Sequence, residues 1–371
     1  IKGGIWKNFF IKYHESNYLH KRMLSHSIHQ DKLTKSALES LYKLQTNDVF
    51  WHGVFGGLYL PNLRDNAYTY LLEIERSHAK KKISYEVGDI DKDGYDELKV
   101  LTKALSLVFS SRFGGQMVEF GSLESLFNWQ NTLMRREEAY HDKILHPKKV
   151  LHVSQENAGD EIATIHSSEE IVDEELKAQL IYDWHPKHSF IDHFSPNSFE
   201  LERFREATFH EVGDFANQAF ELDDKSNTFT REGGIYLDKE YPTALSKQYS
   251  FKDDSISLEL TCKSDYKRKL YYALEFNFHF AHPDLSTLNG ELIGDGLNLS
   301  NIDTLEIIDT FTQKKLIVTL SEECDMSAYT LKTVSQSESG FDTVSQQISL
   351  IFSTAFYSKL NLNIGLGVSN V

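Results

Sequence analysis

The sequence predicts an α+β protein that is mainly β, with a short N-terminal helical segment followed by a large antiparallel β-sandwich. Up to about residue 80, apolar residues recur at helical spacing. From about Ile83 onward, apolar and polar residues alternate in short runs that Gly, Asn, Asp and Ser interrupt. This change of period divides the chain into a helical segment at 1–80 and a sandwich domain at 81–371.

Two stretches of the helical segment carry an apolar face. The first contains Leu33, Ala37, Leu38, Leu41 and Leu44, and the second, around Pro61, contains Leu60, Leu63, Ala67, Leu71 and Leu72. Residues at these spacings fall on one side of a helix, so each stretch predicts a helix that packs against a neighbour.

Three runs predict strands of the sandwich most clearly. They are Ser255–Leu260 (SISLEL), Ile348–Phe352 (ISLIF) and Tyr271–Phe280 (YYALEFNFHF). Alternation of this kind is typical of antiparallel strands with one face toward water. The aromatic side chains of the third run also suit packing between two sheets.

The overall composition limits the partners of the chain. With 371 residues and a formal net charge of −16, the protein lacks the concentrated positive surface that nucleic acid binding needs, and it fits a neutral ligand. No stretch is apolar for long enough to span a bilayer, which predicts no membrane partner.

Cys262 and Cys324 form no C-x-x-C pair, which favours two ordinary cysteines in a reducing cytoplasm. The sequence starts at Ile1, within what we interpret as a segment that continues upstream.

The segment Leu44–Leu60 (LQTNDVFWHGVFGGLYL) has the chemistry of a sugar site. An aromatic ring such as Trp51 can stack on a glucose ring, while a carboxylate such as Asp48 can accept hydrogen bonds from hydroxyls. The two residues are three apart and would share one face of a helix. A buried helix end with a packed tryptophan and a glycine turn explains the same residues, and chemistry alone favours that alternative.

The pattern N-D-x-x-W-H-G-x-F-G-G within this segment resembles the last sequence block shared by family 57 amylases and 4-α-glucanotransferases. The resemblance implies that Asp48 and Trp51 contact substrate at the border of the active-site cleft. It also implies that Asn47 and His52 support them.

Further strings along the chain resemble the same family in the same order. They are Lys7–Met23, Tyr182–Trp184, Asp192–Phe194, His210–Asn217, Arg231–Tyr236 and Ser335–Gly340. The resemblance implies a C-terminal domain that is a large twisted β-sandwich. One departure is that Gln346 and Gln347 are followed by Ile348 where members of the family often have Q-x-x-x-Q-G, which predicts a different turn there.

The resemblance also implies an activity and its location. Retaining glycosidases use two carboxyl groups about 5–5.5 Å apart, and the family supplies both from an N-terminal barrel that nothing in this chain matches. We therefore assign no catalytic residue here and expect the catalytic carboxylates upstream of residue 1.

For the intact polypeptide, the resemblance implies retaining cleavage of α-1,4-glucosidic bonds and transfer of the glycosyl unit to another glucan. The substrate would be an α-glucan or maltooligosaccharide. Two alternatives stay open, namely an α-amylase-type hydrolase and a non-catalytic glucan-binding or scaffold module. Formation of a homo-oligomer through the sandwich is compatible with the sequence, which contains no signal for or against it.

The acidic run Asp89–Glu97 (DIDKDGYDE) resembles a calcium-binding loop in part. Asp89, Asp91 and Asp93 place oxygens at the first, third and fifth positions, and Gly94 follows at the sixth. The twelfth position, where an EF-hand has its bidentate Glu, is Val100, so Glu97 and the Tyr95 carbonyl would complete the set. A solvated acidic turn is the alternative. Ca²⁺ is the one cofactor that the sequence suggests, and no organic cofactor is predicted.

A second group of potential ligands consists of His185, His188, Asp192 and His193. Imidazole and carboxylate groups are zinc ligands, but this spacing matches no zinc motif. A structural role is therefore favoured, and the resemblance gives no role for His185 and His188.

Overall fold

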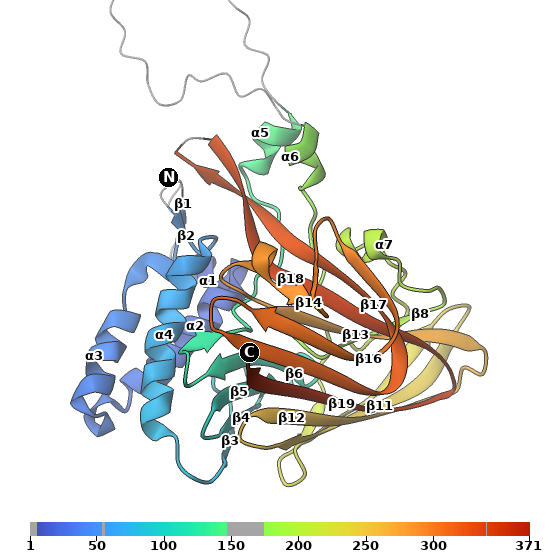
Figure 1. Cartoon of the computed structure of the whole chain (residues 1–371), viewed down its shortest axis with the longest axis horizontal. Helices are drawn as coiled ribbons and strands as arrows, with labels where there is room; N and C mark the ends of the chain where they lie inside the picture. The colour runs from blue at the N-terminus through green and yellow to red at the C-terminus, as the bar shows by residue number, and fades with distance from the viewer. Residues whose placement is uncertain (1–5, 54–55, 147–173, 339) are drawn as a thin grey trace, which may run out of the picture.

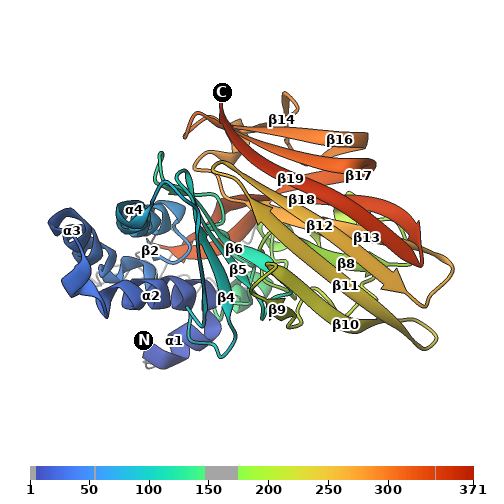
Figure 2. The ribbon, with the colours of Figure 1, turned by 90° about the horizontal axis from the view of Figure 1, so that it is seen from below.

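The computed structural model describes residues 6–53, 56–146, 174–338 and 340–371. Helices form a layer at one end of the molecule, beside a small sheet and then a large, strongly twisted sheet (Figure 1, Figure 2). The predicted fold class, mainly β with an N-terminal helical segment, is confirmed. Within the described ranges, no helix is long and apolar enough to cross a membrane.

The helical layer follows the predicted apolar stretches. It contains α1 (Trp6–Lys12), α2 (His14–Ser27), η1 (Gln30–Lys32), α3 (Lys35–Leu44), η2 (Asn47–Val49) and α4 (Pro61–His78). Thr34 caps the start of α3 because its side chain accepts a hydrogen bond from the Ala37 amide at 3.2 Å. Pro61 occupies the first turn of α4, where its missing N–H has no partner to lose. The apolar faces of α2, α3 and α4 share one core.

The small sheet is antiparallel and its strands follow each other in chain order. They are β3 (Ser84–Gly88), β4 (Glu97–Leu101), β5 (Leu105–Ser110), β6 (Gln116–Ser122) and β7 (Phe127–Asn128). Phe109 of this sheet lies 4.5 Å from Tyr249 of the large sheet between ring centroids, and Phe120 lies 6.2 Å from Phe278. The two sheets therefore share a single apolar core.

The large sheet is antiparallel and forked. One branch runs in the order β9 (Glu221–Asp223), β10 (Thr228–Tyr236), β11 (Glu240–Phe251), β12 (Ser255–Ser264), β19 (Lys359–Asn370), β17 (Lys314–Ser337), β16 (Leu297–Asp309), β14 (Thr287–Leu288) and β15 (Glu291–Leu292). The other branch runs from β17 through β18 (Gly340–Tyr357) and β13 (Lys269–Phe278) to β8 (Ile191–Ser195). The long strand β17 joins them, because its residues 314–320 pair with β19 and its residues 325–337 pair with β18.

Short helices lie outside these layers. They are α5 (His141–Leu145), α6 (Glu174–Ala178), α7 (Leu201–Arg205) and η3 (Pro283–Leu285). Phe204 of α7 and the nearby Phe209 pack against Ala273 and Ile351 and so cover the outer face of β13 and β18. This cover explains why Ile348–Phe352 is buried on both faces, where the sequence predicted one wet face. β12, which has no such cover, keeps the predicted alternation.

Buried ion pairs join the helical layer to the small sheet. The Arg22 guanidinium of α2 contacts Glu75 of α4 at 2.7 Å and Glu119 of β6 at 2.9 Å. Lys99 of β4 also reaches Glu75, at 2.8 Å. Charges buried this deeply are tolerated only when paired, so these contacts fix how α2 and α4 sit on the sheet. Helix α4 ends at His78 and β3 begins at Ser84, and the division into two domains stays a prediction.

A bulge in β18 makes a second bridge to the helices. Leu331 of β17 pairs with Gln347, and the next residue, Lys332, pairs with Ser345. Gln346 is therefore the extra residue of the bulge, and it is fully buried. Its Oε1 accepts from Arg64 Nη2 of α4 at 2.8 Å, and its Nε2 donates to the Tyr59 carbonyl at 2.9 Å. Gln346 and Gln347 thus lie within a strand, where the sequence predicted a turn.

Candidate functional site

The segment that carries Asn47, Asp48, Trp51 and His52 is not one helix. Asn47–Val49 forms the single turn η2. Two short antiparallel strands follow, β1 (His52–Gly53) and β2 (Gly56–Gly57), and this strand pair is called the hairpin below. The expectation that Asp48 and Trp51 share a helical face was therefore wrong. The helical turn ends at Val49, since Phe50 is no longer helical, and strand β1 begins at His52.

Glycines shape the hairpin around Trp51. A Cβ on Gly53 would come within 2.7 Å of the Trp51 ring, and one on Gly57 would come within 2.2 Å of the Trp51 carbonyl oxygen. Gly57 also has a φ of 108°, a backbone angle that residues other than glycine rarely adopt. The Trp51 carbonyl accepts from the Leu58 amide at 3.0 Å. The hairpin therefore holds the backbone of Trp51 in one position.

Exposure separates the predicted contact residues from their neighbours. Asn47 is exposed, Asp48 and Trp51 are partly exposed, and Val49 and Phe50 between them are buried. Val49 and Phe50 anchor the segment in the core of the helices. The carboxylate of Asp48 and the ring of Trp51 are thus accessible to solvent, while the buried Val49 and Phe50 fix the segment that carries them. Their role as substrate contacts stays a prediction.

A hydrogen-bonded cluster centred on Glu138 supports the hairpin from the side. The hydroxyls of Tyr13 and Tyr59 donate to Glu138 Oε1 at 2.7 and 2.8 Å, and Lys12 Nζ contacts Oε2 at 2.7 Å. Burial by itself would raise the pKa of Glu138, but these three donors hold it below its usual value. Glu138 is therefore an ionised, fully engaged carboxylate.

His52 connects the hairpin to this cluster. Its ring packs edge-on against Tyr59 at 4.7 Å between centroids, and its Nε2 lies 3.2 Å from the Tyr140 hydroxyl. The Tyr140 hydroxyl donates to the Val334 carbonyl of β17 at 3.3 Å, so it accepts from His52 Nε2–H. Burial lowers the pKa of His52, which favours the neutral imidazole. The sequence analysis assigned no role to Tyr13, Tyr59, Glu138 or Tyr140.

The structure brings three of the five predicted metal ligands together. Oxygens of Asp89, Asp91 and Asp93 all lie within 4.8 Å of one another. Asp89 Oδ1 also accepts from the Asp93 amide at 3.0 Å, which curls the loop around the carboxylates. Glu97 is not in this group: it is buried and accepts from the Ile90 amide at 2.9 Å and from the Ser110 hydroxyl at 3.3 Å.

Tyr95, the remaining predicted ligand, is tied to the loop through its backbone. Its amide donates to Asp93 Oδ1 at 2.9 Å, and its ring is exposed. Burial and the neighbouring carboxylates raise the pKa of Asp91 to about 7, and burial and Asp91 raise that of Glu97 to about 8. The loop therefore concentrates carboxylate oxygens in the manner that a hard cation prefers.

The histidines considered for zinc belong to a buried ionic network. Nε2 of both His185 and His193 lies 2.9 Å from Glu275 Oε2. Lys187 Nζ contacts Glu275 Oε1 at 3.0 Å and lies 3.3 Å from His185 Nε2. This ammonium group supplies positive charge beside the Glu275 carboxylate and the His185 ring. The arrangement agrees with the favoured structural role.

The other two residues of that zinc hypothesis lie outside the network. Asp192 pairs with Lys247 at 2.8 Å and accepts from the Tyr272 hydroxyl at 2.7 Å. His188 Nδ1 contacts Gln116 Oε1 at 3.1 Å.

The structure defines a mainly β region in which a helical layer and a sandwich share an interface. The family model described as alpha-amylase/4-alpha-glucanotransferase, C-terminal, matches residues 89–366, and the middle-domain model of the same name matches residues 4–78. The chain belongs to this family, which confirms the resemblance seen in its sequence motifs.

Similar proteins carry the same two names. The chain is 30% identical over 355 residues to a 4-alpha-glucanotransferase of Thermococcus litoralis, covering 94% of this chain and 50% of that protein. It is 30% identical over 368 residues to an alpha-amylase of Pyrococcus furiosus, covering 98% and 52%. The crystal structure of the Thermococcus litoralis enzyme aligns with a TM-score of 0.80 at 28% identity, over 99% of this chain and 51% of that one. The chain thus spans about half the length of these relatives.

Proposed function

We propose that this chain is the substrate-contacting, non-catalytic C-terminal region of an enzyme that cleaves α-1,4-glucosidic bonds with retention and transfers the glycosyl unit to another glucan. The single observation that carries the proposal is the match to 4-alpha-glucanotransferases along almost the whole chain. The part of those relatives that the chain does not span is where we infer the two catalytic carboxylates.

The hairpin supplies the contact with glucan in this proposal. Trp51 offers an aromatic face to a glucose ring, and Asp48 accepts hydrogen bonds from sugar hydroxyls, which are stronger because the carboxylate is charged. His52 and the exposed Asn47 support these two residues. The hydrogen bonds around Glu138 keep the hairpin in place, so little ordering is needed when the glucan binds.

Hydrolysis is the second candidate, because alpha-amylases match the chain as well as the transferases do. The two reactions share a covalent glycosyl-enzyme intermediate and differ in the acceptor, which is a glucan in one and water in the other. Product analysis of the native polypeptide on maltoheptaose separates them. Transfer gives oligosaccharides both longer and shorter than the substrate, whereas hydrolysis gives only shorter ones and new reducing ends.

We also propose that the loop Asp89–Glu97 binds Ca²⁺ as a structural ion. Asp89, Asp91 and Asp93 would hold it through carboxylate oxygens, with the Tyr95 carbonyl and Glu97 as further ligands. Glu97 would have to leave the Ile90 amide and the Ser110 hydroxyl to join them. A cation there would offset the repulsion among the three Asp side chains, which is a gain in stability rather than in chemistry.

The setting that we infer is the cytoplasm. Cys262 and Cys324 are both free and buried, which suits a reducing compartment. Burial raises the pKa of both thiols, so neither is poised to react.

A further inference from the structure

A two-stranded ribbon extends from the large sheet toward the hairpin (Figure 1). It consists of residues 332–337 of β17 and 340–345 of β18, which lie beyond the bulge at Gln346. Within the described part of the chain, these two segments pair with each other and with no third strand. Ser335, Gln336 and Ser337, which belong to one of the strings that resemble the family, lie near its tip. The proposed function gives this string no role.

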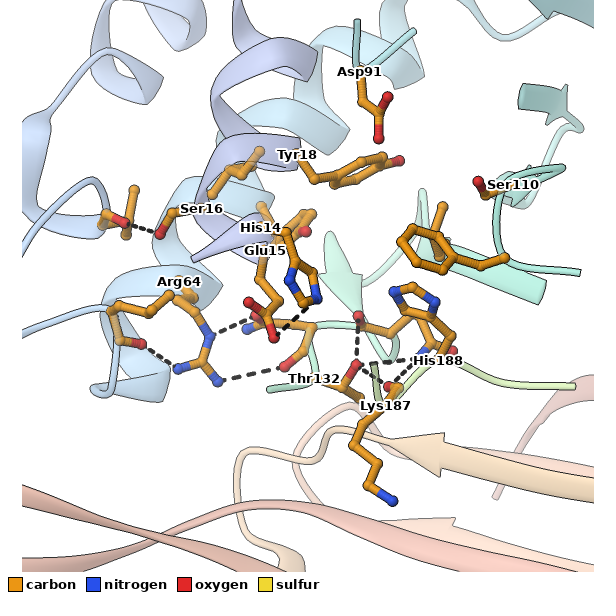
Figure 3. Close-up of a pocket in the computed structure, with 18 residues that line it drawn as sticks. His14, Glu15, Ser16, Tyr18, Arg64, Asp91, Ser110, Thr132, Lys187 and His188 are labelled. Atoms are coloured by element: carbon orange, nitrogen blue, oxygen red, sulfur yellow. Dashed lines mark hydrogen bonds and ion pairs between the residues drawn. The ribbon is translucent and has the colours of Figure 1, made fainter. Parts of the chain in front are cut away.

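The base of the ribbon is bonded to the residues that follow the hairpin. Gln346 accepts from Arg64 Nη2 at 2.8 Å and donates to the Tyr59 carbonyl at 2.9 Å. Arg64 also donates to the Leu58 carbonyl, and Figure 3 shows its side chain with the hydrogen bonds to Leu58 and Asn131. Leu58 and Tyr59 come directly after β2, so these bonds fix the ribbon relative to the hairpin.

The edge of the ribbon is bonded to the residues beside the hairpin. The Val334 carbonyl accepts from the Tyr140 hydroxyl at 3.3 Å and lies 3.1 Å from His141 Nε2. Between ring centroids, Tyr140 is 5.6 Å from His52 and 6.2 Å from Phe341. The rings of His52, Tyr140 and Phe341 are each partly exposed. A row of three accessible rings therefore leads from the hairpin to the ribbon.

Phe341 is an aromatic residue that packs in no core. It belongs to none of the apolar clusters of the described residues. In the same part of the chain, Tyr140 is the one aromatic ring beside it, and no cation lies over it. Apolar surface is more stable when it is removed from water. A ligand that covers Phe341 therefore gains from this exposed ring.

Uncharged polar groups surround Phe341 on the ribbon. Gln336 pairs directly with Phe341 and so shares its face, and Thr343 follows two residues further along that face. The side chains of Gln336 and Thr343 are accessible and make no hydrogen bond within the described ranges. Amide and hydroxyl groups both donate and accept, as sugar hydroxyls do.

The charged residues of the ribbon select no ionic ligand. Lys332 lies at its base, Asp342 lies on the face opposite to Phe341, and Glu338 lies at the turn. One cation and two carboxylates give no concentration of either charge. The surface around Phe341 thus suits a neutral ligand that combines an apolar face with hydroxyl groups.

We propose that Phe341 and Gln336 form a further glucan subsite, so that a chain bound at the hairpin continues past Tyr140 to the ribbon. The Phe341 ring stacks on a glucose unit, and the Gln336 amide exchanges hydrogen bonds with its hydroxyls. The subsite gives the site a preference for longer glucans over short ones. The choice of glucan as the ligand rests on the proposed function.

The test compares a short and a long ligand on the 371-residue chain. Maltose occupies the hairpin alone, whereas maltoheptaose reaches the ribbon as well, so we expect maltoheptaose to bind more tightly in calorimetry at millimolar ligand. Phe341→Ala should weaken maltoheptaose binding about tenfold, the equivalent of about 1.4 kcal/mol, and leave maltose binding unchanged. Phe341→Trp keeps a stacking face and should retain both affinities.

Two further variants complete the set. Gln336→Ala removes the amide and should weaken maltoheptaose binding in the same selective way. Phe311→Ala removes an exposed phenylalanine from the turn between β16 and β17 and should change neither affinity. Melting temperatures of all variants must stay close to that of the parent, and Gln336→Ala decides if Phe341→Ala fails this control.

The outcomes separate the subsite from the proposed function. Equal maltoheptaose affinity with and without Phe341→Ala would overturn the subsite, and loss of both ligands with Trp51→Ala would leave the hairpin contact standing. An equal loss of maltose and maltoheptaose in Phe341→Ala would also overturn it, because the change would then act through the hairpin. Weaker maltoheptaose binding in Phe341→Ala but not in Trp51→Ala would support the ribbon and contradict the hairpin contact. Absence of binding by the unmodified chain would overturn both.

Discussion

Asp48 illustrates how exposure distinguishes a side chain that is available to a ligand from one that is engaged within the protein. It precedes the buried Val49 and Phe50, and its side chain makes no hydrogen bond or ion pair within the described part of the chain. Glu138, by contrast, receives three donors. The two carboxylates are close to the same hairpin, but only the first is available to a ligand.

Replacing Asp48 by Ala should therefore weaken glucan binding with little effect on folding. We expect the free energy of unfolding to change by no more than about 0.5 kcal/mol, as for surface substitutions in general. Melting temperature and maltoheptaose affinity are measured on the same variant. Glu138→Ala serves as the contrast and should destabilise by about 1–3 kcal/mol, because the Tyr13 and Tyr59 hydroxyls lose their acceptor. A comparable loss of stability in Asp48→Ala would show that Asp48 is structural.

His193 gives a pH-dependent contribution to stability. Burial disfavours its charged form, but hydrogen bonds to Glu211 and Glu275 outweigh burial and raise the pKa of His193 from 6.5 to about 9. Because the folded pKa is the higher one, this contribution is fully present below pH 6.5 and is lost as pH rises through about 9.

Unfolding in urea across this range checks the sign. The stability difference between the native chain and His193→Gln should be largest near pH 6 and should shrink by about pH 10. A difference that grows with pH would mean that His193 is neutral in the folded protein.

Among the elements, the acidic loop before β4 gives the sharpest prediction. Calcium should raise the melting temperature, since an ion that binds only the folded state stabilises it by about 2.7 kcal/mol at 100 times its Kd. Asp89→Asn should abolish this rise, whereas Asp284→Asn at an exposed position of η3 should not. An identical melting curve in chelator and in millimolar calcium would refute the calcium proposal.

Local sequence patterns predicted the regular elements well and the irregular ones poorly. The alternation in β12 and the apolar faces of α3 and α4 are local signals, and the structure has those elements. The burial of both faces of Ile348–Phe352 depends on α7, far away in the sequence. No local pattern contains that information.

The candidate site shows the same limit. The N-D-x-x-W-H motif marked this segment, because the residues proposed to contact a ligand are close together in sequence. The sequence did not predict the residues that support this segment, because Tyr13 and Glu138 are 125 residues apart and meet only in the folded chain. The one available signal was the run of charged and aromatic residues at Arg135–His141, which has no characteristic spacing.

For the whole molecule, the arrangement of charge fits a neutral substrate. The net charge is −16, yet the most buried charges, such as Arg22 with Glu75 and Lys187 with Glu275, are paired and hold layers together. These buried carboxylates are engaged with cations and are poor candidates for a nucleophile and an acid. The proposal therefore gives this fold the task of holding a sugar-contacting surface in place, and we infer that bond cleavage belongs to a part of the enzyme beyond this chain.

The most direct test incubates the purified 371-residue chain with maltoheptaose and follows the distribution of chain lengths by mass spectrometry. The account predicts that the distribution stays unchanged, because the chain holds sugar without a catalytic pair of carboxylates. Redistribution at a rate comparable to that of a complete 4-α-glucanotransferase would place the catalytic residues inside this chain and contradict the account.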